Sequence, residues 1–571
     1  MKIETIRHSL SHLMAYAVQE LSPSAKFGIG PAIENGFYYD FQFEKLLANE
    51  DLPKIEARMR ELIKQNLAFK KKTISKVAAK KLFKGQPYKL ELIKDLPGRT
   101  VTVYETGSFF DLCAGPHVKS TQEITLDGFK LAKVAGAYWK GSEKNQMLTR
   151  IYGFAFETKK ELDDYLAMQA EAEKRDHRIL GQKLGLFIFS DLVGKGLPLF
   201  TEKGSIIRRE LERFVINEEI KRGYMHVYTP ELAKVALYKT SGHYPYYKES
   251  MYPVMKIDEE EFILRPMTCP HHFQLYASQP RSYKELPFRV AELAKQFRYE
   301  KSGELTGLIR VRVFCLADAH IICQKDAALN EIKEVFDLIE YVAQRLGLKV
   351  GVDYRYRLSL GDRKDGKKYY KDDAAWASAE NILRKVLVER KSPFFEAKNE
   401  AAFYGPKIDV QMKNFSGKEE TAFTIQYDFV MPKRFKLTYV DKDGQEKEPV
   451  VIHRSSIGAI ERTIAFLLEH YAGALPFWLS PVQVCVIPIA DRHLPYAQKI
   501  KNELEGFRVE ISQENETLAK RIREAEMQKI PYILVVGDKE IAHNAVGVRV
   551  RGKGDVGTMT LDEFIKKYAR T

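Results

Sequence analysis

The sequence predicts an α+β protein that is built from several domains. Its 571 residues exceed what one hydrophobic core normally holds, so we expect three or four domains. Hydrophobic residues make up 45% and charged residues 29% of the chain, which is typical of a globular protein. The pattern of helices and strands changes near residues 159, 185 and 479, which places the expected domain boundaries there.

The chain carries no signal for export or membrane insertion. No uncharged apolar run reaches the length of a transmembrane helix, and the amino terminus has no apolar signal core. The five cysteines are an odd number without the spacing of a disulfide framework, which is typical of a reducing compartment. We therefore expect a cytoplasmic protein with no membrane partner.

The first predicted domain, residues 1–158, has mixed α/β character. Apolar residues recur at helical spacing from Ile6 to Leu21, which predicts an amphipathic helix. Short strand patterns separated by Gly- and Pro-containing turns follow it, for example at 27–41, 99–106 and 148–156. The next residues, 159–184, are charged and strongly helical, which predicts a linker helix between two bodies.

Residues 185–478 are predicted to form a large domain around an antiparallel sheet. Extended patterns separated by Gly-containing turns favour antiparallel pairing over regular βαβ units. The expected strands lie at 288–300, 308–323 and 420–431, and the expected helices at 205–222, 328–346 and 375–389. The last part, 479–571, alternates buried-type strands with helices and predicts a small α/β domain.

The charge distribution permits a nucleic-acid partner. The net charge is +14, and the segment from Lys64 to Lys94 holds ten lysines and one acidic residue, Glu91. Such a segment is able to follow a phosphate backbone, but a solvated lysine-rich face gives the same pattern. Composition alone leaves both interpretations open.

Two His-containing pairs in the first domain form a candidate site. His8 and His12 are four residues apart on one face of the predicted helix, and Cys113 and His117 are four apart in a Gly-Pro turn. The four side chains are a plausible zinc set. The same imidazoles, with the nearby Asp111, are equally able to orient an attacking water without metal. Structural or exposed histidines are the third alternative.

A second candidate site lies in the middle domain. Cys269 stands in RPMTCPHH, while His320 and His453 lie in or beside apolar strand patterns. Their spacing matches no zinc finger or ribbon, but a thiolate with two imidazoles and an open position is a catalytic type of zinc site. Histidines of the core whose hydrogen bonds are satisfied by protein groups would give the same pattern.

Several arginines form the third candidate. Arg298 and Glu300 precede a Gly-containing loop, and Arg310 and Arg312 are expected on the returning strand. Guanidinium groups on adjacent strands are able to converge on phosphate oxygens, although a surface salt-bridge network is the alternative. Arg462 is expected in the first turns of a helix after Gly458. No Walker A or GxGxxG motif is present, so a bound nucleotide would not use a P-loop.

Three segments resemble the signature motifs of class II aminoacyl-tRNA synthetases. KGSIIRRELERFVINEEIKRGYMHVYTPEL resembles motif 1, a dimer-interface helix followed by a strand; FRYE…GLIRVR resembles motif 2 and IGAIERTIAFLLE motif 3. Together with HSLSH, GPAIENGFYYDF, DLCAGPH, GAYWKG, MTCP, DAH, FYGPKID and IHR, they make essentially the whole chain similar to bacterial-type threonyl-tRNA synthetases. The family's small ubiquitin-like leading domain is expected to be missing.

The resemblance implies a function for each domain. Residues 1–158 would be an editing domain, 185–478 the class II catalytic domain and 479–571 the anticodon-binding domain. The enzyme would be a homodimer that joins L-threonine to tRNA(Thr) with ATP and Mg²⁺, holds one Zn²⁺ per subunit, and hydrolyses mischarged Ser-tRNA(Thr). Editing follows from the chemistry, because serine has the same chelating groups and one methyl discriminates by only about 1–3 kcal/mol.

The resemblance also assigns residues to each site. The implied ATP residues are Arg298, Glu300, Arg310 and Arg462, and the threonine residues are Met267, Asp318, Tyr404 and Gln426. The zinc ligands are Cys269, His320 and His453, and the editing residues are His8, His12, Lys89, Asp111, Cys113 and His117. The anticodon residues are Asn515, Lys529, Glu540 and Arg549.

Four positions depart from the family pattern. Lys529 replaces the usual arginine, Leu316 replaces a glutamine near the substrate, and Thr421 and Ala459 replace polar residues that border the nucleotide and threonine. We expect an active enzyme nevertheless, because the implied zinc ligands and ATP arginines are all present.

Overall fold

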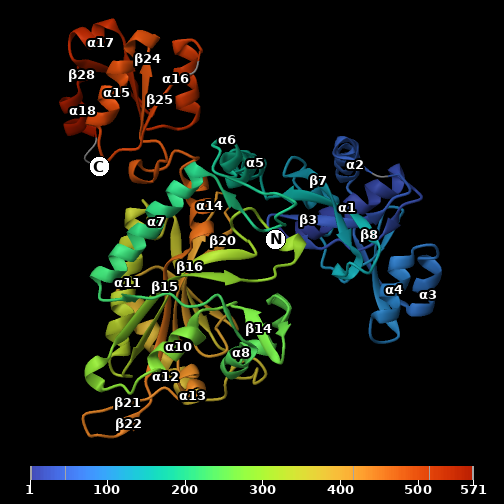
Figure 1. Ribbon diagram of the computed structural model, residues 1–571. Helices are drawn as coiled ribbons and strands as arrows, with labels where there is room; N and C mark the ends of the chain where they lie inside the picture. Colours follow the sequence, from blue (N-terminus) through green and yellow to red (C-terminus); the bar gives the residue numbers. More distant parts are fainter. Residues whose placement is uncertain (1–2, 46, 416, 514, 569–571) are drawn as a thin grey trace. The chain divides into compact units, whose positions relative to one another are not determined.

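The chain divides into two units, Met1–Ala170 and Glu171–Thr571, which are described separately. The computed structural model describes residues 3–45, 47–415, 417–513 and 515–568 (Figure 1). Among these residues, no helix combines the length and apolar character that crossing a membrane requires. The predicted α+β multidomain architecture is confirmed.

Unit 1 is built on a long amino-terminal helix that packs against an antiparallel sheet. Helix α1 (Ile3–Leu21) buries Leu10, Leu13 and Met14 in the same core as β3, as the apolar spacing predicts. The sheet has the order β1-β3-β8-β7, and β2 also pairs with β3. The bounds are β1 Lys26–Phe27, β2 Ala32–Ile33, β3 Gly36–Gln42, β7 Phe129–Tyr138, β8 Met147–Ala155 and α2 Leu52–Lys64.

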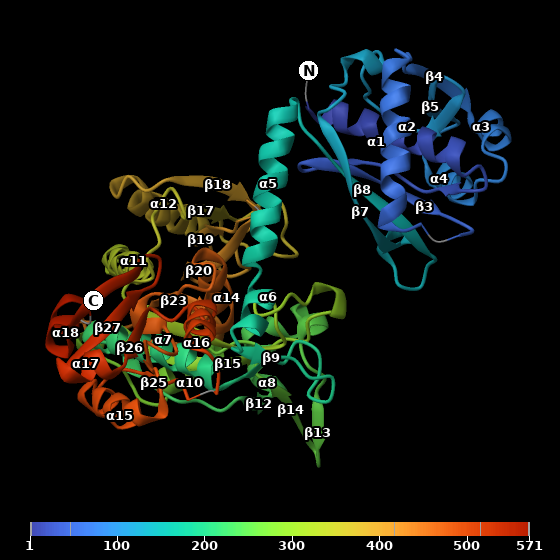
Figure 2. The same cartoon turned by 90° about the horizontal axis from the view of Figure 1, so that it is seen from above.

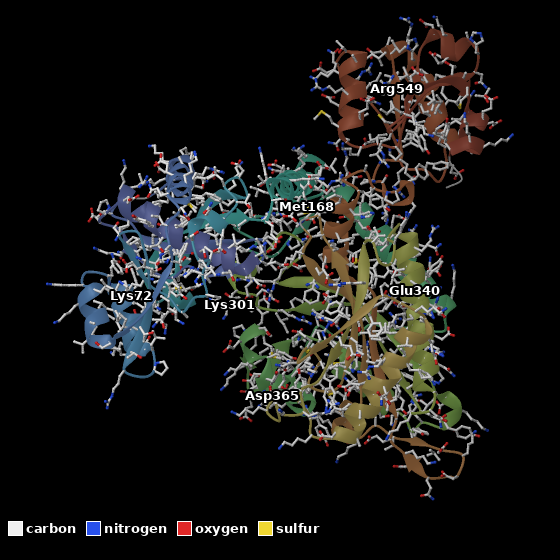
Figure 3. All side chains as sticks on the ribbon, turned by 180° about the vertical axis from the view of Figure 1, so that it is seen from behind. Lys72, Met168, Lys301, Glu340, Asp365 and Arg549 are labelled. Carbon is white, nitrogen blue, oxygen red and sulfur yellow. The ribbon has the colours of Figure 1, made fainter. Side chains whose placement is uncertain are left out.

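A second, smaller sheet completes unit 1. It has the order β4-β5-β6 and carries two short helices on the lysine-rich segment. The bounds are β4 Lys70–Ser75, α3 Lys76–Leu82, α4 Pro87–Asp95, β5 Thr100–Thr106 and β6 Phe109–Leu112. Lys72 on β4, labelled in Figure 3, is exposed like most lysines of this segment.

The linker predicted as one helix over residues 159–184 is two helices. Helix α5 (Lys159–Arg175), visible in Figure 2, is followed by α6 (His177–Lys183). Asp176 interrupts them because its φ and ψ are not helical and its carboxylate accepts a hydrogen bond from the backbone N–H of Arg178, 2.8 Å away. Aspartate in this position caps the amino end of the second helix.

The central element of unit 2 is an eight-stranded sheet with the order β11-β15-β16-β23-β20-β19-β17-β18. Its six inner strands are antiparallel, as predicted, whereas the outer pairs β11–β15 and β17–β18 are parallel. The bounds are β11 Met225–His226, β15 Phe288–Phe297, β16 Val313–Cys323, β17 Tyr354–Leu360, β18 Phe394–Lys398, β19 Lys407–Lys413, β20 Glu419–Asp428 and β23 Val450–Ala459.

The two strands expected to carry arginines are shorter than predicted. β15 ends at Phe297 and β16 begins at Val313, so Arg298, Arg310 and Arg312 lie outside the strands. The prediction that Arg310 and Arg312 are on the returning strand is therefore wrong. The carbonyl of Arg312 still accepts from the Arg298 N–H at 3.0 Å, but its own N–H donates to the carbonyl of Gly196, 2.8 Å away, so the strand pairing does not continue to Arg310.

Four long helices share the main core with one face of this sheet. They are α7 Glu202–Lys221, α11 Ala328–Arg345, α12 Asp373–Glu389 and α14 Ile460–His470. On β16, Ala317, Ala319 and Ile321 point into this core, so the side chains between them point to the other face. His320 is one of those, and the candidate site lies on that face.

Smaller elements surround the sheet. Their bounds are β9 Phe187–Ile188, β10 Leu199–Phe200, β12 Leu232–Lys234, α8 Val235–Ser241, α9 His243–Tyr246, β13 Met255–Ile257, β14 Glu260–Leu264, α10 Cys269–Ala277, α13 Met431–Phe435, β21 Tyr439–Val440 and β22 Glu446–Lys447.

The last part of unit 2 is the predicted small α/β fold. Its sheet has the order β25-β24-β26-β27-β28, in which the first three strands are parallel and the last two antiparallel. The bounds are β24 Val484–Pro488, α15 Leu494–Glu503, β25 Val509–Ile511, α16 Leu518–Met527, β26 Tyr532–Val536, α17 Asp538–Ala542, β27 Ala545–Val550, β28 Gly554–Thr560 and α18 Leu561–Tyr568.

Candidate functional site

A cavity of about 310 Å³ in unit 2 brings together three groups of residues that are far apart in the sequence. Its walls include every residue assigned above to ATP, threonine or zinc. These are Met267, Cys269, Arg298, Glu300, Arg310, Asp318, His320, Tyr404, Gln426, His453 and Arg462.

Cys269, His320 and His453 form a buried triad in this cavity. The cysteine Sγ and one nitrogen of each imidazole lie within 4.8 Å of one another. The sheet register explains the meeting, because His320 on β16 lies directly opposite His453 on β23. Cys269 is the first residue of α10, which packs against β16. Burial lowers the pKa of His320 and raises that of the Cys269 thiol, so each favours its neutral form in the absence of a cation.

Hydrogen bonds leave one nitrogen of each histidine available to a metal. His453 Nε2 lies 2.7 Å from the Asp428 carboxylate, and His320 Nδ1 lies 2.7 Å from His272 Nδ1. His272 Nε2 in turn lies 3.3 Å from the Glu292 carboxylate. Among the described residues no hydrogen bond engages the remaining atoms, His320 Nε2, which lies 3.9 Å from the Asp318 carboxylate, and His453 Nδ1, so both are able to act as ligands. Outer partners of this kind fix the orientation of metal-binding imidazoles. The donor set therefore fits Zn²⁺.

The cavity also gathers three arginines. Arg298 follows β15 directly and donates to the Gln296 side chain and to the Pro266 carbonyl. Arg462, in the first turn of α14 as predicted, donates to the carbonyls of Ile309 and Thr421 at 3.1 and 2.8 Å. Burial lowers the pKa of both guanidinium groups, which is the expected cost of holding cations ready for a polyanion.

Arg310 is more exposed than the other two arginines. Its Nε lies 3.0 Å from the Glu300 carboxylate, which places both residues at the same part of the wall. Its Nη2 also lies 3.4 Å from the Glu304 carboxylate, and a guanidinium with five N–H donors keeps further N–H groups for a phosphate beside these two pairings.

Polar side chains line the wall beside the triad. Tyr404 donates to the Gln426 side-chain oxygen at 2.6 Å, and Gln426 lies opposite His453 in the sheet register. Asp318 accepts a hydrogen bond from Gln296, and burial raises the pKa of its carboxyl group. This end of the cavity thus offers a hydroxyl, an amide and a carboxyl group to a small polar substrate.

The departures from the family pattern lie on the same walls. Leu316 and Ala459 face each other across β16 and β23, and both line the cavity together with Thr421. The Thr421 hydroxyl accepts a hydrogen bond of 2.6 Å from Gln411. The pair Leu316–Ala459 therefore gives an apolar surface where the resemblance implies polar side chains.

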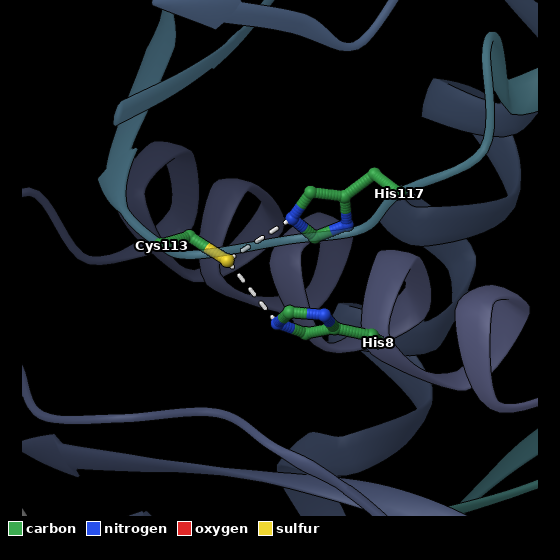
Figure 4. Close-up of side chains that lie close together, drawn as sticks. All are labelled: His8, Cys113 and His117. Carbon is green, nitrogen blue, oxygen red and sulfur yellow. Dashed lines mark hydrogen bonds between the residues drawn. The ribbon is translucent and has the colours of Figure 1, made fainter. Parts of the chain in front are cut away.

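Unit 1 contains a second cluster, shown in Figure 4. The Cys113 Sγ lies 3.1 Å from His8 Nε2 and 3.2 Å from His117 Nε2. Burial raises the pKa of the thiol to about 11 and lowers that of His117 to about 2. At neutral pH the cluster therefore holds a protonated thiol and a neutral His117 imidazole. Ser9, a residue that the sequence did not single out, contacts His117 Nδ1 at 3.2 Å.

His12 does not join this cluster as a possible ligand. Its ring packs against Phe109 and Phe69, with centroids 4.9 and 5.4 Å away. Neither ring nitrogen has a hydrogen-bond partner among the described residues, and burial lowers its pKa to about 3. The four-ligand set left open by the sequence is therefore not assembled, because aromatic rings enclose the fourth side chain.

Lys89 and Asp111 form a buried ion pair beside the cluster. Lys89 Nζ lies 2.5 Å from one oxygen of Asp111, and the other oxygen accepts a hydrogen bond of 2.7 Å from Tyr39. Tyr39 was not among the predicted residues, although it stands in the quoted GFYYDF segment. The group places a cation and an anion next to a thiol and two imidazoles.

The four residues assigned to the anticodon lie toward both ends of the last sheet. Asn515 and Glu540 follow the carboxyl ends of β25 and β26, and Glu540 accepts a hydrogen bond from the Gly537 backbone. Lys529 precedes β26, and Arg549 on β27 lies opposite Ile533 near the start of β26 (Figure 3). The parallel order of β24, β25 and β26 thus separates the four residues into two pairs.

Comparisons with known proteins match three regions of the chain. Residues 252–471 match the family "tRNA synthetase class II core domain (G, H, P, S and T)". Residues 483–571 match "Anticodon binding domain", and residues 101–152 match "Threonyl and Alanyl tRNA synthetase second additional domain".

Curated relatives match nearly the whole chain. Threonine--tRNA ligase of Geobacillus sp. (strain WCH70) is 51% identical over 569 residues, which cover 99% of this chain and 88% of the relative. Threonine--tRNA ligase 1 of Bacillus subtilis (strain 168) is 49% identical over 571 residues, with coverages of 99% and 88%.

Solved structures of threonyl-tRNA synthetases are also similar to this chain. The RNA binding domain of threonyl-tRNA synthetase from Cryptosporidium parvum Iowa II superposes with a TM-score of 0.64 and 35% identity, covering 69% of this chain and 98% of that one. ThrRS-1 from Aeropyrum pernix, a putative threonyl-tRNA synthetase by its title, gives 0.61 and 32%, with coverages of 69% and 94%. With half of its residues identical to those of curated relatives over nearly its full length, the chain belongs to the threonyl-tRNA synthetase family of class II aminoacyl-tRNA synthetases.

Proposed function

We propose that the chain activates L-threonine with ATP to threonyl-adenylate and transfers the threonyl group to tRNA(Thr). The observation that carries the proposal is that a Cys/His/His triad and two partly buried arginines, Arg298 and Arg462, line one cavity. The arginines suit the phosphates of ATP, which would enter as its Mg²⁺ complex, and the triad end suits threonine. Curated relatives with the name threonine--tRNA ligase support this activity.

The arginines would act by position and charge. Attack of the threonine carboxylate on the α-phosphate needs no general base, because the carboxylate is already ionised at neutral pH. Arg298 and Arg462 would hold the α-phosphate in line and stabilise the charge that develops on it, while Glu300 would bind the adenine end. Arg310 would add further donors to the same polyanion.

Cys269, His320 and His453 would hold one Zn²⁺ per subunit. When bound, the ion supplies a Lewis-acid position for the amino nitrogen and hydroxyl of threonine. Asp318 and the Tyr404–Gln426 pair would orient the same groups, and Met267 would limit the space around the methyl group. Valine lacks the hydroxyl, and sites built for a hydroxyl reject such analogues by about 10⁴–10⁵.

Threonine activation is tested by measuring threonine-dependent ATP–pyrophosphate exchange with purified protein whose zinc content has been determined. We expect about one zinc per chain, since the triad is a single three-ligand site with an open position. Threonine should support exchange, serine should support it about 10–200-fold less well, and valine should not support it. Exchange with serine and none with threonine would contradict the proposal.

We propose that unit 1 edits mischarged Ser-tRNA(Thr). A Cys113 thiol with a pKa of about 11 is a poor nucleophile, so water is the better candidate to attack the ester carbonyl. The neutral imidazole of His8 would accept its proton. His117, whose pKa of about 2 makes it a poor base, would orient the water, and the buried Lys89–Asp111 pair would orient the ester. A zinc content near two per chain would favour a metal at His8, Cys113 and His117 instead.

The lysine-rich segment supports a tRNA partner for unit 1. Eight of its ten lysines are exposed, whereas Lys89 is buried in the ion pair with Asp111. The exposed residues are Lys64, Lys70, Lys71, Lys72, Lys80, Lys81, Lys84 and Lys94. Such a face is suited to the phosphates of the acceptor end of a tRNA.

The domain roles follow from these assignments. We propose that residues 1–158 edit, 159–184 link, 185–478 activate and transfer threonine, and 479–571 bind the anticodon through Asn515, Lys529, Glu540 and Arg549. Five free cysteines support a cytoplasmic location, because thiols persist in a reducing compartment.

We also propose that the chain is a homodimer formed through the motif 1 region. Large apolar side chains are exposed in this segment, Tyr228 at 94% and Ile220 at 53%, and Leu192, which precedes it, is exposed at 100%. Exposed apolar side chains of this kind suit an interaction surface. Light scattering should therefore give twice the chain mass of 65.8 kDa. The double variant L192D/Y228D should shift it toward the single mass, and a wild-type monomer at micromolar concentration would contradict the dimer.

A further inference from the structure

His177, the first residue of α6, uses both of its ring nitrogens inside unit 2. It is 1% exposed. Its Nε2 lies 3.0 Å from the backbone nitrogen of Leu308, and its Nδ1 lies 2.7 Å from a carboxylate oxygen of Glu469. Because a backbone N–H only donates, Nε2 must carry no proton, and Nδ1–H donates to the carboxylate. The network thus assigns one neutral tautomer to His177.

One partner of His177 belongs to the nucleotide wall. Leu308 lies in a tight turn that is closed by the Ile309 N–H and the Arg310 N–H, both donating to the Thr306 carbonyl, at 2.9 and 3.2 Å. The turn carries Arg310 into the cavity, and the carbonyl of Ile309 accepts the hydrogen bond from Arg462 Nε. Holding the Leu308 N–H therefore holds the segment that positions two phosphate-facing arginines.

The other partner of His177, Glu469, lies on the helix that carries Arg462. Glu469 lies on α14, seven residues after Arg462, which is two helical turns on the same face. His177 therefore joins the turn at Leu308 to the helix that carries Arg462. Arg175, just before the break between α5 and α6, adds a second tie through a hydrogen bond of 3.1 Å to the His470 carbonyl.

The backbone of the turn leaves space for the His177 ring only because residue 307 is a glycine. Gly307 has a φ of +47°, and a Cβ at this position would lie 2.1 Å from His177 Nε2. Glycine accepts this backbone conformation and leaves room for the ring. The contact between the turn and the ring therefore requires both a glycine at 307 and a histidine at 177.

A metal at this place is the alternative. Asp176, His177 and Glu469 offer atoms within 4.8 Å of one another. However, both ring nitrogens of His177 are engaged, and the Asp176 carboxylate is bound by the N–H and the guanidinium of Arg178. The geometry favours a hydrogen-bonded connection over a metal site.

We propose that His177 is a positioning residue for ATP, which fixes the turn 306–310 against α14 and thereby sets Arg310 and Arg462 at the phosphates. The proposal rests on the proposed synthetase activity. His177 does not itself line the cavity and contacts only the nucleotide wall, through Leu308, so its effect should fall on ATP and not on threonine.

Two substitutions of His177 test its hydrogen bonds to Glu469 and to Leu308 separately. In H177N the amide is able to replace Nδ1 toward Glu469 but leaves Leu308 without an acceptor. In H177Q the longer side chain is able to bring its oxygen to the Leu308 N–H. We expect H177N to raise the KM for ATP in pyrophosphate exchange about tenfold, with the KM for threonine within about twofold, and H177Q to recover most of the loss.

His493 provides a matched control. It is also buried, its Nδ1 accepts from the Ala490 backbone N–H at 3.1 Å, and its Nε2 lies 3.0 Å from the Asp538 carboxylate, but it is in the last domain. H493N should lower the melting temperature and leave the KM for ATP unchanged. ATP affinity measured by calorimetry should follow the same order as the KM values.

Two results would overturn the role of His177. One is an unchanged KM and affinity for ATP in H177N. The other is an equal change in the KM values for ATP and threonine that accompanies a fall in melting temperature, as expected of damage to the fold alone. A wild-type protein that shows no exchange would contradict the proposed function instead, and the calorimetric comparison would still test His177.

Discussion

Replacing His320 by alanine is expected to leave the protein without zinc and without threonine-dependent exchange. The histidine supplies one of three ligand atoms, and its removal leaves a thiol and one imidazole, which is too few for a stable zinc site. Activity should fall by about a thousandfold or more, because the site both orients and recognises the amino acid. Atomic emission on the purified variant, followed by pyrophosphate exchange, measures both effects.

His271 is the control for this experiment. It lies on α10, two residues after Cys269, is buried, and has a pKa of about 4 because burial disfavours its charged form. Its ring is not part of the triad. H271A should therefore keep its zinc and its exchange activity. Full zinc content in H320A, or equal loss of zinc in both variants, would show that the triad is not the metal site.

Replacing His8 by alanine is expected to abolish deacylation of Ser-tRNA(Thr) and to leave exchange intact. His8 contributes one of the two imidazoles beside Cys113, and loss of a positioned base typically costs about 10²–10⁴ in rate. The measurement is the release of serine from preformed Ser-tRNA(Thr). Because the exchange reaction does not use tRNA and the proposed activation residues all lie in unit 2, the same preparation should activate threonine at the wild-type rate.

Arg298→Ala makes the complementary variant. It should lose exchange and keep deacylation, since Arg298 lies in unit 2 and His8 in unit 1. Together the two variants test whether activation and editing are separate reactions of separate sites. Loss of both activities in either variant would contradict that division.

The family resemblance predicted the triad of Cys269, His320 and His453, whereas residue types and strand context alone left a zinc site and hydrogen-bonded core histidines both open. Cys269, His320 and His453 are 51 and 133 residues apart, so spacing carried no information, but apolar strand patterns placed both histidines in the sheet. The outer partners could not be predicted. His272 and Asp428 take their roles from the approach of α10 and from the alignment of β20 with β23, which only tertiary packing decides.

Two local predictions failed for identifiable reasons. The alternation in LIRVR is typical of a strand, yet residues 306–310 form a turn because Gly307 takes positive φ and the Leu308 N–H binds an imidazole. The linker was predicted as one helix because charged and apolar residues continue through Asp176. Its side chain competes for a backbone N–H, which ends one helix and starts another.

The pairing of His320 with His453, and of His453 with Gln426, makes the proposed zinc site depend on the alignment of three strands. Because neighbouring residues on a strand point to opposite faces, a shift of one residue in β23 would turn the His453 side chain into the helical core, away from Cys269 and His320. A misaligned sheet would thus contain both histidines and bind no zinc. If the triad holds zinc as proposed, the zinc content of a refolded sample would report the fraction of molecules whose central sheet has formed in the correct register.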